Sequence, residues 1–222
     1  MAIYVAYARI AATCGSTERN ALVFGIIYAM KMLLAMLAAL PVLAGCLGTA
    51  PKAPRNWTVD WSGPSAEGVP EVAADAPSAK LLQLDVLAPY GGTRLAVLRG
   101  DGSLAFDHFN SFAAQPASLL KGAAFDVLEQ SGVFSRVVRP NSSAAADFAL
   151  EVTVTRLALD CRAEGRMEAS VALSATLVGG RAVVSAARGE ASAPVSAGNF
   201  SAAFSRAFEE SLLEAVRSLK VR

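Results

Sequence analysis

Two long stretches of alternating residues restrict the fold of this chain more than any other feature of its sequence. In each stretch, apolar side chains take every second position, and small or polar side chains fall between them. The apolar positions are Phe148, Leu150, Val152 and Val154 in the first stretch, and Met167, Ala169, Val171, Leu173, Ala175 and Leu177 in the second. A period of two places one set of side chains in a core and the other set in water. The pattern therefore predicts strands of a sheet that is covered on one face only.

The glycines that follow the second stretch predict a hairpin. Gly179 and Gly180 supply a two-residue turn with positive φ, and residues 181–193 are expected to return as the partner strand. Shorter apolar runs bounded by Gly, Pro and Asp predict further strands. These strands are expected to begin at Leu82 with Leu84 and Val86 on the same face, and then to cover residues 94–99, 103–107 and 133–138.

Two helices are predicted from apolar residues at three- and four-residue spacing. The first begins near Pro116 and ends at Gly132, and the second begins after Asn199 as N-cap. Their apolar faces are Leu119, Leu120, Ala123, Ala124, Val127 and Leu128, and then Phe200, Phe204, Phe208, Leu212 and Leu219. The order of strands, helix, strands, helix predicts an α+β domain, in which an antiparallel or mixed sheet carries two helices in a two-layer sandwich.

Residues 30–46 have the anatomy of a secretory signal. Lys31 is followed by about a dozen apolar residues, and small residues precede Cys46. The ending Leu43, Ala44, Gly45 and Cys46 resembles the lipobox of bacterial lipoproteins. That resemblance implies a diacylglycerol on the Cys46 thiol and cleavage before it, so that the acyl chains anchor the protein in a membrane. Leu47 follows the cysteine, which by resemblance to enterobacterial sorting favours the periplasmic face of the outer membrane.

The first 29 residues leave the start of the protein open. Translation could begin at Met30, or residues 1–45 could form one extended leader and signal peptide. A third interpretation is an uncleaved membrane anchor over residues 21–42. Lys31 argues against this anchor, because a charge near the middle of a span is costly.

Residues 46–79 are expected to form a lipidated tether, and residues 80–222 the α+β domain. The tether is rich in proline, with Pro51, Pro54, Pro64, Pro70 and Pro77, and this composition is typical of an extended spacer. Within it, Trp57, Val59 and Trp61 alternate with polar residues. This short piece, over residues 57–61, is either an edge strand clamped onto the domain or an aromatic contact for a partner or for lipid headgroups.

Charge and composition exclude several function classes. Removal of residues 1–45 leaves a net charge of −1, which offers no basic surface for nucleic acid. Once Cys46 is acylated and Cys14 is removed, Cys161 is the only thiol that remains, and we expect it to be buried or idle. His108 is the only histidine and is expected in a loop before the first helix. Since nucleotide-binding and nucleophile motifs are also missing, the sequence predicts a protein that is not an enzyme and needs no cofactor or metal.

The order of these pieces resembles the ABC-type transport auxiliary lipoproteins, which accompany lipid transporters of the mammalian-cell-entry type. The resemblance lies in the lipobox, in residues 57–60, 84–99, 112–113, 131–134 and 147–150, in the glycine hairpin and in the terminal helix. It implies a non-enzymatic accessory component whose partners are a periplasmic substrate-binding protein and a permease. The alternatives are an outer-membrane assembly or structural lipoprotein, and a carrier of apolar ligands. A homo-oligomer is compatible with each.

Overall fold

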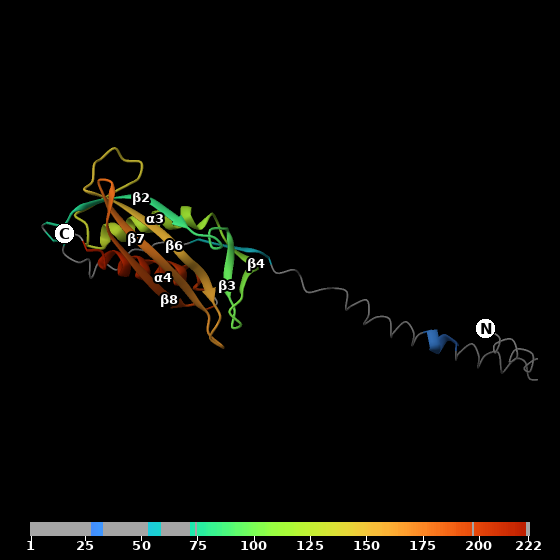
Figure 1. The fold of residues 1–222 in the computed structure, drawn as a ribbon. Helices are drawn as coiled ribbons and strands as arrows, with labels where there is room; N and C mark the ends of the chain where they lie inside the picture. The colour runs from blue at the N-terminus through green and yellow to red at the C-terminus, as the bar shows by residue number, and fades with distance from the viewer. Residues whose placement is uncertain (1–27, 33–52, 59–71, 74, 197, 221–222) are drawn as a thin grey trace, which may run out of the picture. The chain divides into compact units, whose positions relative to one another are not determined.

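The computed structural model describes residues 28–32, 53–58, 72–73, 75–196 and 198–220 (Figure 1). The chain divides into two units, Met1–Lys52 and Ala53–Arg222. In the first unit, residues 28–32 form a short helical segment. The predicted lipobox at Leu43, Ala44, Gly45 and Cys46 lies outside the described residues. Among the helices that are described, none is long and apolar enough to cross a membrane.

The second unit contains eight strands and two helices among its described residues. In chain order these are β1 (Arg55–Trp57), β2 (Ser78–Val86), β3 (Arg94–Leu98), β4 (Leu104–Phe112), α3 (Pro116–Gln130), β5 (Arg136–Val138), β6 (Phe148–Asp160), β7 (Glu168–Gly179), β8 (Ala182–Pro194) and α4 (Phe200–Arg217). All eight strands belong to one mixed sheet. The predicted α+β class is confirmed.

Strand β6 organises the sheet. Along one side it pairs antiparallel with β7 over almost its whole length, and β7 pairs antiparallel with β8. Along the other side, β2 pairs in parallel with the first part of β6, and β3 pairs in parallel with its end. Strand β5 lies outside β2, while β4 and then β1 lie outside β3. The long β6–β7–β8 meander is therefore the scaffold on which the shorter strands are assembled.

Both helices pack on the same face of the sheet (Figure 1). Helix α4 covers β7 and β8, helix α3 covers β2 and β5, and the two helices contact each other. The largest fully buried side chains come from both layers and include Phe204, Phe208, Leu212, Leu120, Leu128, Leu173 and Leu177. Burial of a side chain of this size stabilises the fold by about 1.5–3 kcal/mol before entropic costs. The predicted phenylalanine stripe of the last helix is therefore core.

Helix α4 lies unusually close to β8 at Gly189. A Cβ atom built on Gly189 would stand 1.9 Å from the carbonyl oxygen of Ser211 in α4. A real side chain cannot occupy that space, so Gly189 permits a backbone contact between helix and strand. This contact holds α4 against one face of the sheet, and both helices of the described part of this unit lie on that face.

The helix boundaries follow the predicted signals. Pro116 occupies the first turn of α3, and Gly132 follows its C-cap Ser131 with a φ of +70°. Asn199 is the N-cap of α4 by position, but its side-chain oxygen accepts a hydrogen bond from the backbone N–H of Ser196 at 2.6 Å. The Asn199 side chain therefore ties the preceding loop together and does not cap a helical N–H.

Several strand details differ from the predictions. Leu82 was expected in the core but is 48% exposed, because a bulge between Leu81 and Gln83 shifts the alternation. Leu81 is buried in its place, while Leu84 is buried as predicted. Met167 precedes β7 and is 49% exposed. Strand β4 runs on to Phe112, so His108 lies in a strand and not in a loop.

The hairpin between β7 and β8 also turns one residue later than expected. Gly179 pairs with Ala182, so the two-residue loop is Gly180 and Arg181, and only Gly180 among them has a positive φ, at +64°. The return strand itself, predicted at 181–193, is confirmed as β8.

Candidate functional site

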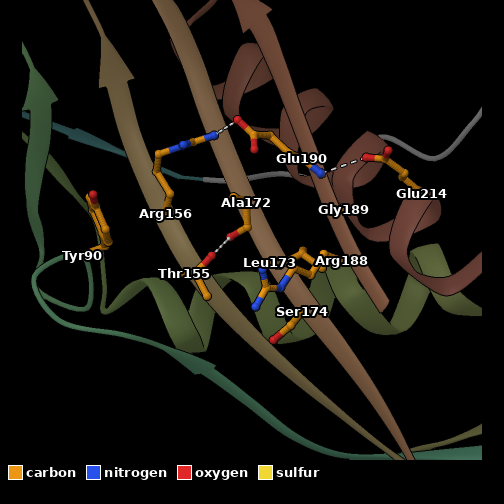
Figure 2. A pocket seen from close by; sticks show the side chains of 10 residues that line it. All are labelled: Tyr90, Thr155, Arg156, Ala172, Leu173, Ser174, Arg188, Gly189, Glu190 and Glu214. Carbon is orange, nitrogen blue, oxygen red and sulfur yellow. Dashed lines mark hydrogen bonds and ion pairs between the residues drawn. The ribbon is translucent and has the colours of Figure 1, made fainter. Parts of the chain in front are cut away.

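The face of the β6–β7–β8 meander opposite α4 carries a groove of about 600 Å³ (Figure 2). In Figure 2 the helices lie behind the strands, and most of the lining side chains project from the near side of the sheet. The groove is lined by Tyr90, Thr155, Arg156, Ala172, Leu173, Ser174, Arg188, Gly189, Glu190 and Glu214. Three strands therefore supply most of it, and Tyr90 from the β2–β3 connection forms one wall.

One row of side chains crosses the groove from β6 to β8. Arg156 is paired with Ala172 on β7, and Ala172 is paired with Glu190 on β8. Because Ala172 is small, the Arg156 side chain passes over it and forms an ion pair with the Glu190 carboxylate (Figure 2). A larger residue at position 172 would occupy the space that this ion pair needs.

A bulge in β6 directs Arg156 into this row. The register shifts between Val154 and Arg156, which makes Thr155 the extra residue. The Thr155 hydroxyl donates a hydrogen bond to the carbonyl oxygen of Ala172 at 3.2 Å. Bulges commonly redirect side chains beside functional sites. Here the bulge places an arginine on the open face between the apolar side chains of Val154 and Leu157, which are both buried.

Arg156 has unfilled hydrogen-bonding capacity. Its side chain is 23% exposed, while that of Glu190 is 67% exposed. The Arg156 Nε atom is buried and has no hydrogen-bond acceptor within the part of the chain that the structure describes. A buried donor without an acceptor is unfavourable, so this nitrogen is a local cost to stability.

Two further charged residues complete the groove. Arg188 stands opposite Ser174 in the neighbouring row, and its exposed guanidinium makes no ion pair or hydrogen bond within the described residues. Glu214 of α4 reaches the edge of the sheet, where its Oε2 atom accepts the backbone N–H of Glu190 at 2.8 Å (Figure 2). This bond occupies one of the N–H groups that β8 exposes at the sheet edge.

A third arginine lies near the end of the groove. Arg162 forms a bidentate pair with Asp160, with contacts of 3.0 Å from Nε and 2.6 Å from the terminal nitrogen. The hydrogen bond and charge of Asp160 raise the pKa of Arg162, and the charges of Glu190 and Tyr90 contribute further. The same hydrogen bond lowers the pKa of Asp160. Arg162 is thus already satisfied, in contrast to Arg156 and Arg188.

The residues predicted as sites lie elsewhere. Trp57 is in the edge strand β1, two residues earlier than the predicted strand, and Trp61 is outside the described residues. The Trp57 Nε1 atom donates to Asn110 Oδ1 at 3.0 Å, and its ring stands 4.7 Å from that of Phe200. Trp57 therefore secures the edge strand to β4 and α4.

The other two residues considered in the sequence, Cys161 and His108, do not line the groove. Cys161 is half-buried, and burial, followed by the charge of Asp160, raises the pKa of its thiol, which therefore stays protonated at neutral pH. His108 is exposed on β4. Across the residues that are described, no group of three or more His, Cys, Asp or Glu side chains could hold a metal ion.

The groove itself was not predicted from the sequence. One signal could have indicated it: in β6 the buried apolar residues follow a period of two up to Val154 and then resume at Leu157 and Leu159. A slip of one residue in an alternating strand predicts a bulge, and Arg156 stands directly after it.

Comparisons with known proteins concern the fold. No protein-family model matches the chain, and no curated protein matches it. A Xanthomonas campestris protein assigned to the family DUF330 is similar in structure, with 21% identity, a TM-score of 0.51, and coverage of 72% of this chain and 86% of that chain. The PelC dodecamer of Paraburkholderia phytofirmans gives 15% identity, a TM-score of 0.39, and coverage of 67% and 95%. At such identity the first likeness establishes a shared fold alone.

Proposed function

We propose that this protein is a lipid-anchored component of a bacterial cell envelope that acts as a non-enzymatic accessory module of an ABC-type lipid transport system. Its domain would bind partners or ligands through the open face of the sheet, and partner proteins would supply the nucleotide hydrolysis and the membrane channel. The partners implied are a periplasmic substrate-binding protein and a permease.

The observation that carries this proposal is the lipobox-like ending at Leu43, Ala44, Gly45 and Cys46, placed directly before the folded domain. Two acyl chains hold a protein stably on a bilayer, whereas one chain gives marginal binding. The stretch from Cys46 to the start of β1 at Arg55 can span at most about 32 Å when fully extended. An acylated Cys46 would therefore keep the domain close to the membrane surface.

The open face supports a binding role. Its charged groups are held by the β6–β7–β8 meander and project from a rigid sheet, which is favourable for recognition because little order is gained on binding. The arginine and glutamate side chains there are suited to hydrogen bonding with a polar or charged ligand. The resemblance of the sequence to the auxiliary lipoproteins adds the transport context.

Lipidation is tested by intact-mass measurement of the full-length product extracted from bacterial membranes. We expect a chain that starts at Cys46 with the added mass of its acyl groups, and Cys46→Ala should move the protein from the membrane to the soluble fraction. An unmodified chain that starts at Met1 would contradict the proposal.

The transport context is tested separately by mild crosslinking in the native host followed by co-purification. Recovery of a substrate-binding protein together with a permease supports the accessory role. Recovery of barrel-assembly proteins or peptidoglycan alone would replace it with an assembly or structural role. Cys46→Ala serves as the control, since a protein released from the membrane should lose these partners.

A further inference from the structure

A further cavity, of about 280 Å³, lies between helix α3 and the turn that follows β5. We call it the α3 pocket, and it shares no lining residue with the open-face groove. It is lined by Leu81, Lys121, Gly122, Phe125, Arg139, Pro140 and Asn141. The lining therefore contains two cations and no carboxylate, and apart from one amide its other side chains are apolar.

Hydrogen bonds hold the turn that forms one wall of the α3 pocket. The backbone N–H of Ser142 donates to the carbonyl oxygen of Arg139 at 3.1 Å, which closes a turn with Pro140 at its second position. The Lys80 Nζ atom on β2 donates to the carbonyl oxygen of Ser142 at 2.8 Å and ties this turn to the sheet. The pocket is therefore formed before a ligand arrives, which lowers the ordering cost of binding.

Both cations of the α3 pocket are exposed and unpaired. The Arg139 Cζ atom stands 4.2 Å from the centroid of the Phe125 ring, so the ring positions the guanidinium beside the pocket. Lys121 and Arg139 make no hydrogen bond or ion pair through their side chains within the described residues. The two carboxylates of α3, Asp126 and Glu129, do not line the pocket. An anion is therefore the complement of this surface.

Gly122 keeps part of the α3 pocket open. It lies inside α3, where glycine weakens a helix relative to alanine. Its φ is not positive, and an added Cβ would meet nothing within 4 Å, so neither the backbone conformation nor the packing requires glycine. Because Gly122 lines the pocket, a larger side chain there would take up its space. The glycine therefore lowers helix stability and leaves room for a ligand.

The size and lining of the pocket restrict the kind of anion. Its volume lies just below the range of about 300–1,000 Å³ that is usual for small-molecule sites. Its floor is apolar, with Leu81 fully buried and Phe125 7% exposed. The charged donors are one ammonium and one guanidinium, whereas phosphate is commonly held at a helix N-terminus by several backbone N–H groups. Lys121 and Gly122 stand in the middle of α3, where these groups are already used. A compact anion with a single charge therefore suits the pocket best.

We propose that the α3 pocket binds a monocarboxylate that carries one compact apolar group. The carboxylate would contact Lys121 and Arg139, and the apolar group would lie against Phe125 and Pro140. This chemistry occurs in a free organic acid and at the end of a protein chain whose last residue is apolar. Neither source depends on the proposed transport role, so this proposal is tested independently of it.

The experiment is a calorimetric titration of the full-length protein, purified in a non-ionic detergent, with the detergent alone as the blank. The probes are 3-phenylpropanoate, 3-phenylpropanamide, acetate and phenyl phosphate. We expect 3-phenylpropanoate to bind at least about tenfold more tightly than the amide, which lacks the charge, and than acetate, which lacks the apolar group. Equal binding of the amide, or tighter binding of phenyl phosphate, would overturn the proposal.

Variants of the lining assign the binding to the α3 pocket. Lys121→Gln and Arg139→Gln are each expected to weaken 3-phenylpropanoate about tenfold and to leave the weak binding of 3-phenylpropanamide unchanged. Gly122→Leu should abolish binding because it fills the pocket. The same variant should lose no stability in urea unfolding, since leucine is a better helix former than glycine.

The matched control is Arg181→Gln, which removes an exposed cation in the β7–β8 turn outside the pocket. This control should leave the binding of 3-phenylpropanoate unchanged. An equal loss in the control would show that general charge causes the effect. Undiminished binding by Gly122→Leu would show that the acid binds elsewhere, and either result would overturn the proposal.

One further pair of probes separates the two sources of the carboxylate. It consists of the peptide acetyl-alanyl-alanyl-phenylalanine and the same peptide with a C-terminal amide. If the acid form binds more tightly than 3-phenylpropanoate, the pocket takes a chain end, and if it binds more weakly, the pocket takes a free acid. Equal binding of the peptide and its amide would contradict a carboxylate site.

Discussion

The two faces of the β6–β7–β8 meander use small residues for opposite purposes. On the covered face, Gly189 lets α4 approach until an added Cβ would stand 1.9 Å from the Ser211 carbonyl. On the open face, Ala172 leaves the space through which Arg156 reaches Glu190 and in which a groove of about 600 Å³ remains. Gly189 thus allows α4 to pack closely on the sheet, and Ala172 leaves space free on the open face. The effect of a small residue therefore depends on whether it faces the helix or the open side of the sheet.

The largest contrast is expected between two adjacent residues of β7. Leu173 is buried on the face that α4 covers, opposite Gly189, whereas Ser174 lies on the open face, opposite Arg188. Leu173→Ala should lower the free energy of unfolding by about 2–5 kcal/mol, because it removes apolar contacts and leaves a cavity. Ser174→Ala should change the free energy of unfolding by less than about 0.5 kcal/mol. Urea unfolding followed by circular dichroism measures both.

Comparable losses in the two variants would contradict this contrast and would indicate that an unobserved layer covers the open face. Since the two residues are neighbours in one strand, differences in strand propensity cannot explain a large gap. The same measurements therefore test the one-sided covering of the sheet directly.

The next effect concerns the contact between α4 and β8. Gly189→Ala should lower the free energy of unfolding by about 1–3 kcal/mol, since the added methyl group must displace the backbone of α4. Gly122→Ala is the matched control: it lies within α3, where nothing stands within 4 Å of an added Cβ. That control should stabilise the protein by about 0.5–1 kcal/mol through helix propensity. A neutral Gly189→Ala would show that α4 can move away from β8 at little cost.

A smaller effect on stability is expected in acid. It concerns Asp147, which directly precedes β6 and contacts Ser78 at the start of β2. The hydroxyl and backbone N–H of Ser78 donate to Asp147 Oδ2 at 2.7 and 2.8 Å, and these bonds lower the pKa of Asp147 below its usual value of 3.8. The unfolded chain therefore binds this proton more readily than the folded chain. The stabilisation is present above pH 3.8 and is lost as the pH falls through the folded pKa.

Urea midpoints measured across this acid range test the assignment. Asp147→Asn should show a flatter fall in stability with acid than the unchanged protein, and Ser78→Ala should flatten it in the same way by removing a donor. If Asp147→Asn keeps the original pH dependence, other carboxylates carry the acid sensitivity.

The strands and helices of the covered face could be predicted because their apolar residues repeat with the period of their own secondary structure. The phenylalanine stripe from Phe200 to Phe208 and the alternation from Ala169 to Leu177 are such cases, and both are buried. The prediction that Leu82 is buried was wrong because a bulge changes the phase of the alternation within one strand. This shift depends on the pairing of that strand with β6. The period of apolar residues in a sequence predicts which face of the sheet a side chain occupies only where the strand contains no bulge.

The groove could not be predicted for a related reason. Arg156, Arg188 and Glu190 look like ordinary solvated residues in the sequence, since a wet strand face is expected to carry charges. Their meeting depends on the register of three strands and on the bulge at Thr155, which together align residues more than thirty positions apart in the chain. Pairing across strands is set by the whole sheet, so the composition of any one strand does not reveal it.

The smallest expected effect sharpens what the open face is for. Glu190→Gln removes the charge that pairs with Arg156, but the Glu190 side chain is 67% exposed. Exposed ion pairs contribute about 0–1 kcal/mol because solvent screens them, so the free energy of unfolding should hardly change. Urea unfolding in low and high salt measures this contribution. A loss of unfolding free energy near that of Leu173→Ala would mean that the ion pair holds the sheet together. A negligible loss would mean that the strands keep these charges in place without depending on them for stability, as expected for residues that serve a ligand.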